Sequence, residues 1–176
     1  PSHGEPILGN DNINKEMLRY RDAIQYVHDM TVEGMNEGKD VYSLMRSIKL
    51  PEELDVGEAY GWVSWSVRGI YEGYMGWFDG NPTSLSPLSP KEEAKRFIDV
   101  AGGNAAVLTA AQKALKNGDF QWALQLVDRL LNVDYDVVNA RKLKADALRA
   151  HAVAQINCPT RHYYIQYAKE LEQGDV

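Results

Sequence analysis

The sequence NAAVLTAAQKALKNGDFQWALQLVDRLLNVDYDVVNARKLKADALRAHAVAQ, residues 104–155, has the clearest pattern in this 176-residue chain. Apolar residues recur in it at spacings of three and four, which places them on one face of an α-helix. Gly118 and Asp119 separate the first apolar run from the second, and Asp136 precedes the third. We expect three helices of about 14 residues with short connections, which pack antiparallel. The pattern predicts a tetratricopeptide-like helical hairpin region, although fewer than the roughly three repeats of a stable array are present.

Each of these three helices has one face that we expect to point into the core. Small alanines on the faces would let neighbouring helices approach closely. Asp119 and Asp136 are the expected N-caps of the second and third helices, and Pro159-Thr160 is expected to start a last helix that carries Tyr163, Tyr167 and Leu171. The inward residues are Val107, Ala111, Ala114, Leu115, Phe120, Ala123, Leu124, Val127, Leu130, Leu131, Ala140, Leu143, Ala147, Ala150 and Ala154.

Two further apolar stripes lie in the first half of the chain. The first predicts a helix over residues 14–38, capped by Asn14, with Met17, Tyr20, Ile24, Val27 and Thr31 on one face. The second predicts a helix over residues 58–75. Its stripe is Tyr60, Val63, Val67, Ile70, Tyr71 and Tyr74, while Trp62, Trp65 and Met75 fall outside it. A helix that is apolar on more than one face is buried on several sides, in its own core or against a partner.

Shorter signals lie between these stripes. Asp40 is a cap candidate for a short helix that Pro51 ends, and Gly76–Pro82 reads as a turn. Ser89, Pro90 and Glu92 have the spacing of a capping box with proline at the first helical position. No segment alternates with period two for more than a few residues. We therefore predict an all-α, multi-helix bundle.

Composition excludes several classes of partner. The formal net charge is −6, whereas binding a nucleic-acid backbone needs clustered lysine and arginine. Mean hydropathy is −0.43, and no apolar run approaches the roughly 20 residues needed to span a bilayer. We expect neither nucleic acid nor a membrane as partner. Cys158 is the single cysteine, so disulfides within the chain and cysteine-type zinc sites are excluded.

Residues with catalytic chemistry are sparse. No two of the four histidines, His3, His28, His151 and His162, have the spacing that places both on one metal ion. The chain contains no GxSxG, P-loop or GxGxxG motif. Arg68 and Glu72 lie four residues apart and are expected to form an ordinary ion pair on a helix face. From the residues alone, the chain is a helical association module.

Three segments carry a resemblance to a known family. They are residues 60–82, YGWVSWSVRGIYEGYMGWFDGNP, residues 101–105, AGGNA, and residues 117–123, NGDFQWA. The long GWFDGNP block and the two shorter segments resemble the dimerisation domain of metallo-β-lactamase-superfamily alkyl sulfatases. The resemblance covers nearly the whole chain.

The resemblance implies a larger parent hydrolase of sulfuric or related esters. Residues 1–13 would be the end of its metallo-β-lactamase-like catalytic domain, and residues 14–176 the helical dimerisation domain. His3, in the PSHG start of the chain, would be one ligand of a two-zinc site whose other ligands lie upstream, so we expect no cofactor in this chain by itself. The first residues carry no initiator methionine or targeting segment, and we expect the chain to be a piece of a longer protein.

The resemblance also implies partners for the chain, and it shows one position at which the chain differs from the family. The partners would be a second copy of the chain and the catalytic domain, and the parents in this family are often periplasmic or secreted. Alkyl sulfatases have a histidine at the position of Trp65, in a helix that faces the sulfate pocket, and the indole N–H is only a donor. This leaves the substrate of the parent open, and a stand-alone tetratricopeptide-like interaction module remains the alternative function. Candidates for the interface or core are Tyr60, Trp62, Trp65, Tyr71, Tyr74, Trp77 and Phe78.

Overall fold

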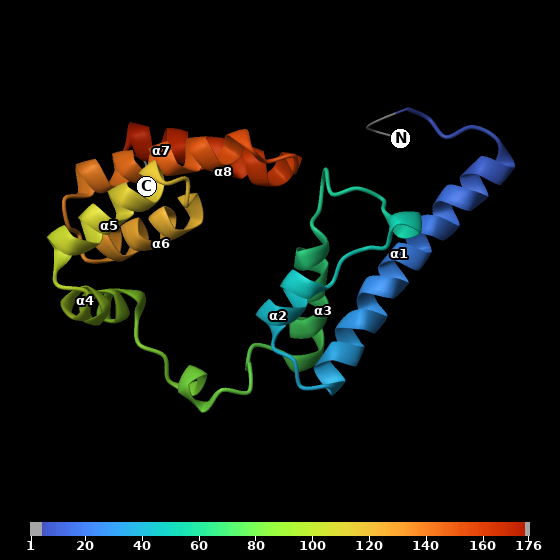
Figure 1. Ribbon diagram of the computed structural model, residues 1–176, viewed down its shortest axis with the longest axis horizontal. Coiled ribbons are helices and arrows are strands. Elements are labelled where there is room, and N and C mark those ends of the chain that lie inside the picture. The colour runs from blue at the N-terminus through green and yellow to red at the C-terminus, as the bar shows by residue number, and fades with distance from the viewer. Residues whose placement is uncertain (1–4, 175–176) are drawn as a thin grey trace. The chain divides into compact units, whose positions relative to one another are not determined.

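The computed structural model describes residues 5–174 and is helical throughout its regular structure, with no strand in that range (Figure 1). This confirms the predicted all-α fold. The chain divides into two compact units, the first ending at Asn81 and the second beginning at Pro82. The first unit holds α1 (Asn10–Asn36), α2 (Val41–Ser47), the short 3₁₀ helix η1 (Glu52–Leu54) and α3 (Val63–Met75).

The second unit holds η2 (Pro82–Leu85), α4 (Pro90–Val100), α5 (Asn104–Lys116), α6 (Phe120–Asn132), α7 (Val137–Val153) and α8 (Cys158–Gln173). Consecutive helices from α5 to α8 pack on one another, and α4 packs on α6. Their connections are three or four residues long. The three helices predicted for residues 104–155 are therefore confirmed as α5, α6 and α7.

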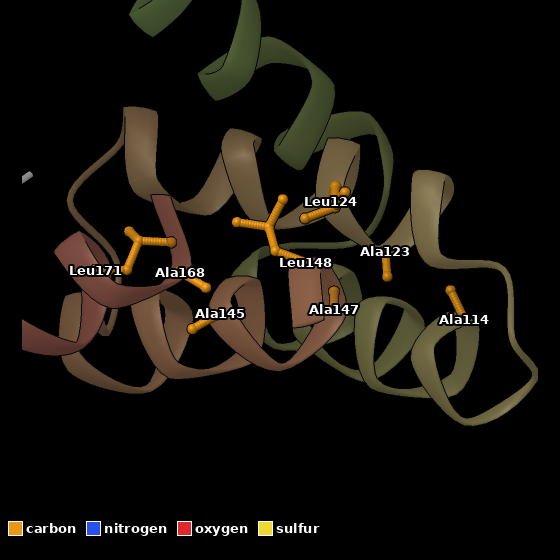
Figure 2. Close-up of a cluster of buried hydrophobic side chains, with 8 residues drawn as sticks. All are labelled: Ala114, Ala123, Leu124, Ala145, Ala147, Leu148, Ala168 and Leu171. Atoms are coloured by element: carbon orange, nitrogen blue, oxygen red, sulfur yellow. The ribbon is translucent and has the colours of Figure 1, made fainter. Parts of the chain in front are cut away.

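Small residues set the spacing in the second unit. Figure 2 shows one of its two buried clusters, formed by side chains from α5, α6, α7 and α8. Five of its eight members are alanines, so the helix backbones can approach closely. The other cluster joins α4, α5, α6 and α7 around Val127 and Leu130, neither of which is exposed. Together, the clusters bury side chains along every helix from α4 to α8.

Helix α7 is buried on two faces, whereas its sequence pattern predicts only one. Ala140 and Ala147 point inward as predicted, but Ala145, Leu148 and Ala152 are also buried, whereas Ala154 is exposed. α7 contacts α6 on one side and α8 on the other. A helix between two neighbours needs two apolar faces, and the prediction assumed one.

Most predicted caps are present in the structure. Asp40 and Asp119 accept backbone N–H bonds from Ser43 and Trp122, and Ser89 and Glu92 form the complete capping box. Asp136 does stand at the N-cap of α7, but its carboxylate accepts from the side-chain amide of Asn139 at 2.9 and 3.0 Å, with no backbone cap bond.

Two helix starts in the first unit differ from prediction. α1 begins at Asn10, after Gly9 with φ of 85°, so Asn14 lies inside the helix and is not its cap. α3 begins at Val63 instead of residue 58, which leaves Tyr60 and Trp62 outside the helix. A carboxylate oxygen of Glu58 accepts the N–H of Val63 at 2.7 Å. Glu58 is therefore folded back to cap the helix that it was expected to begin.

The core of the first unit is small. Its buried cluster contains Val27 of α1, Leu44 of α2, Ile48 directly after α2, and Val67 of α3. Partly buried residues packed against this cluster include Ile70 and Tyr71, the latter one of the candidates from the sequence. Gly34 allows α2 to approach α1, because a Cβ there would meet Leu44 Cδ2 at 2.3 Å. The core thus covers only the second half of the 27-residue helix α1.

Candidate functional site

The first unit leaves a long apolar stripe on α1 uncovered. Ile13, Met17, Tyr20, Ile24, Val27 and Thr31 follow one another at spacings of four and three, which places them on one face. Val27 and Thr31 are buried beneath the small core, but Met17 is 64% exposed and Tyr20 and Ile24 are each 56% exposed. The same face is therefore core at one end of the helix and bare at the other.

Helix α3 and the segments directly before and after it add exposed apolar groups, most of them aromatic. Trp65 is 47% exposed and Trp77 is 77% exposed, and Tyr60, Tyr74 and Met75 are also exposed. Trp62 and Phe78 are half-buried, with the Trp62 ring 6.4 Å from that of Trp65 and the Phe78 ring 5.9 Å from that of Trp77. Of the seven interface or core candidates from the sequence, only Tyr71 lies against the buried cluster.

A short polar chain joins α1 to α3. His28 Nε2 lies 2.8 Å from the hydroxyl of Tyr74, and its Nδ1 lies 2.9 Å from a carboxylate oxygen of Asp29. Hydrogen bonds, first from His28 and then from Gln25, hold the pKa of Asp29 below its ordinary value. No sequence pattern predicts this contact, because His28 and Tyr74 lie 46 residues apart and meet only in the fold. It fixes the end of α3 against α1 and leaves Tyr74 exposed.

A cavity of about 360 Å³ lies in the same unit, between α1, the segment before α3, and α3 itself. Tyr20, Ile24, Trp62 and Ile70 are among its lining residues. The indole Nε1 of Trp62 is buried and has no hydrogen-bond partner. The structure therefore brings Tyr60 and Trp62 together with the α1 stripe at this cavity, while Trp65 is not among its lining residues.

Metal-binding residues are not clustered in the described part of the chain. Among residues 5–174, no group of three or more His, Cys, Asp or Glu side chains could hold a metal ion. His3, the predicted metal ligand, lies outside the described residues. The Arg68–Glu72 ion pair forms as predicted, at 2.7 Å and half exposed. In the same range, no helix is long and apolar enough to cross a membrane.

Comparison with known proteins identifies the class of this domain. The profile of the family described as alkyl sulfatase dimerisation matches residues 41–174. The chain therefore belongs to the alkyl sulfatase dimerisation family, as the GWFDGNP resemblance implied.

Individual relatives agree with this assignment. A linear primary-alkylsulfatase of Pseudomonas sp. (strain ATCC 19151) is 42% identical over the whole chain, which covers 35% of that protein. An alkyl/aryl-sulfatase of Saccharomyces cerevisiae is 33% identical over 98% of the chain and 27% of that protein. A solved stereoselective inverting sec-alkylsulfatase from Pseudomonas sp. has a TM-score of 0.91 at 33% identity, over 98% of the chain and 28% of the solved one. The chain spans about a third or less of these relatives.

Proposed function

We propose that this chain is the self-association domain of a longer zinc-dependent sulfuric ester hydrolase, and that it forms a symmetric homodimer through its first unit. The observation that carries the proposal is the uncovered half of the α1 stripe. Apolar patches larger than a few hundred Å² are rare on monomers and mark partner surfaces. Its membership of a family described as dimerising supports the same reading.

The geometry of α1 favours a second copy as the partner. A helix of 27 residues is about 40 Å long, and the first unit covers only one end of it. In a two-fold dimer the same surface meets itself, so the bare ends of two α1 helices would cover each other. Obligate homodimer interfaces bury about 2,000 Å² or more and are rich in aromatic residues and Met. The exposed aromatic groups of α3 and its turn would supply part of that area.

A charge placed on the bare stripe should separate the copies. Met17→Asp would bury a carboxylate in an apolar interface, and the expected mass by light scattering is that of one chain. Val138→Asp is the matched control, because Val138 is highly exposed on α7 in the second unit. A Met17→Asp variant that stays dimeric, or a Val138→Asp variant that becomes monomeric, would contradict the proposed interface.

The catalytic part of the proposal rests on the relatives, which are alkylsulfatases much longer than this chain. The parent would carry a metallo-β-lactamase-like domain with two zinc ions, and His3 would be one ligand. The described residues supply no metal site, so the hydrolytic steps are not assigned to them. An HxHxDH motif upstream in the full gene supports this parent, and its absence favours a stand-alone interaction module.

The chain by itself should lack hydrolase activity and a tight zinc site, since one histidine cannot hold zinc against water. Sulfatase turnover by the chain with about one zinc per chain would contradict this. In the full-length parent, a panel of sulfate, phosphate and carboxylic esters would identify the substrate.

Trp65 is the position at which the parent would differ most in chemistry from other alkyl sulfatases. Its ring is half exposed on α3 and lies beside Trp62. We propose that it stands where the family has a histidine that assists the sulfate chemistry. Trp65→His in the full-length protein should raise the rate on an alkyl sulfate strongly. An unchanged rate would assign Trp65 to packing in the pocket wall or the interface.

A further inference from the structure

The uncovered part of the α1 stripe has the same spacing when it is read in either direction. Its exposed members are Ile13, Met17, Tyr20 and Ile24. They follow one another at steps of four, three and four residues, so the outer pair and the inner pair share one midpoint, between Leu18 and Arg19. When two such helices lie antiparallel about this midpoint, each exposed member of one stripe is level with an exposed member of the other.

The extent of the bare region gives the same midpoint independently. α1 begins at Asn10, and Val27 is the first member of the stripe that belongs to the buried cluster of the first unit. Halfway between these two residues is again the position between Leu18 and Arg19. An antiparallel partner helix would therefore begin level with the point where the core starts. Each copy would cover about 27 Å of the other helix.

A parallel pair does not fit the same face. A two-fold axis along the helices would place each residue beside its own copy, and the partner helix would follow the stripe past Val27 and Thr31. Both residues are already buried beneath the core of their own unit. Because two helices in contact have axes only about 8–10 Å apart, a parallel partner would have to displace that core. The antiparallel pair ends before it.

We propose that the chain dimerises by antiparallel pairing of α1 about a two-fold axis level with the bond between Leu18 and Arg19. Ile13 then faces the partner's Ile24, and Met17 faces the partner's Tyr20. Each contact occurs twice, as a two-fold interface requires. The orientation and register rest on the proposed function, which supplies the dimer and its location on the bare stripe.

The two kinds of contact are chemically matched. Ile13 and Ile24 are both aliphatic, and a methionine sulfur is attracted to an aromatic ring such as that of Tyr20. Tyr20 and Ile24 also line the cavity between α1 and α3. In this register the partner's Ile13 and Met17 would lie beside those lining residues and add apolar side chains there.

Disulfide cross-linking tests the register. The single cysteine is first removed by Cys158→Ser, and Ile13→Cys and Ile24→Cys are then combined in one chain. Thiols at these positions lie about 17 Å apart on one helix, too far for a bond within the chain. Across the proposed pair they face each other within the roughly 7 Å between Cα atoms that a disulfide can span. Oxidation should therefore double the 19.8 kDa mass of the chain on a non-reducing gel.

Three controls isolate the register from simple proximity. With Ile13→Cys alone, or Ile24→Cys alone, the two thiols of a dimer lie about 17 Å apart along the pair and should not cross-link. The combination of Ile13→Cys with Tyr20→Cys uses the same exposed stripe, but its nearest thiols are offset by about 6 Å along the helices. It should cross-link much less than the matched pair. Circular dichroism and sedimentation before oxidation establish that each variant is folded and dimeric.

The outcomes separate this proposal from the proposed function. A dimer in which the matched pair fails to cross-link, or cross-links no better than the offset pair, overturns the register and leaves the dimer standing. Cross-linking by Ile13→Cys alone overturns the antiparallel orientation. A mass of one chain before oxidation, for the unsubstituted chain as well as the variants, overturns the proposed self-association and this register with it.

Discussion

The two units of the chain use apolar residues in opposite ways. Between Pro82 and Gly174, seventeen hydrophobic residues are buried, spread over every helix from α4 to α8. Between Glu5 and Asn81, only five are buried, although Tyr, Trp, Met and Ile are abundant there and many of them are exposed. The second unit therefore buries many more of its hydrophobic residues than the first, which leaves large apolar side chains of α1 and α3 exposed.

The residue types explain this contrast. The helices of the second unit meet largely through alanines, which let the helix backbones pack closely. The first unit carries large side chains on a helix that extends beyond its core. We infer that the second unit supplies stability and the first supplies association.

The largest effect is expected from Leu130→Ala in the second unit. Leu130 is completely buried between α6 and its neighbours, and removal of such a side chain leaves a cavity that costs about 3 kcal/mol. Hydrogen exchange should rise in α5–α8 and stay unchanged in α1–α3. Equal loss of protection in both units would show that they unfold as one body and would weaken the division of roles.

A somewhat smaller effect is expected from Asn157→Ala. Asn157 is completely buried at the start of α8, where its side-chain oxygen accepts the N–H and the hydroxyl of Thr160 at 3.0 and 2.9 Å. Loss of this cap should lower the free energy of unfolding by about 2 kcal/mol. Urea unfolding measures it. A loss below about 0.5 kcal/mol would show that water replaces the cap and that α8 adds little to the unit.

Two glycine substitutions probe how tightly the first unit is packed. Gly34→Ala puts a methyl group within 2.3 Å of the buried Leu44 Cδ2, and the overlap should outweigh the helix propensity gained, for a net loss of about 1 kcal/mol. Gly69→Ala on α3 meets nothing within 4 Å and should stabilise by about 0.5–1 kcal/mol. Thermal unfolding compares the pair, and a stabilising Gly34→Ala would show that the small core is loose.

The smallest effect is a dependence of the second unit on pH. His151 stacks on Tyr164 with ring centroids 5.0 Å apart, and burial lowers its pKa below the ordinary value. The unfolded chain therefore binds the proton more tightly, so stability should fall as pH decreases through about 6.5 towards the lower folded pKa. Urea midpoints across this range should lose that component in His151→Phe. An unchanged profile would assign the pH dependence to other groups.

Local sequence signals predicted the second unit well. The capping box at Ser89 and the cap at Asp119 depend only on neighbouring residues, so they survive in any helical fold. The second face of α7 was missed because alanine is compatible with both exposed and buried positions. Ala145 and Ala152 are buried on a helix that packs against α8, and this packing cannot be predicted from the sequence of α7 alone.

The candidate site was predicted less completely, because it depends on contacts between distant residues. The aromatic residues of α3 were recognised, but the bare end of α1 and the cavity at Trp62 appear only when α1 and α3 are placed together. The sequence pattern places Glu58 inside a helix. Its carboxylate instead accepts the N–H of Val63, five residues later, and no local pattern predicts this bond. The apolar stripe of α1 can be recognised from the spacing of its residues. The spacing does not show which half of the helix is covered by the rest of the unit.

Sedimentation equilibrium of the unsubstituted chain at micromolar concentration tests the division of roles most directly. The expected result is a species of twice the 19.8 kDa of one chain, which dissociates when Met17 on the bare stripe of α1 is replaced by aspartate. A single species near 19.8 kDa at all micromolar concentrations would contradict the account, because the exposed apolar face of the first unit would then have no second copy to cover it.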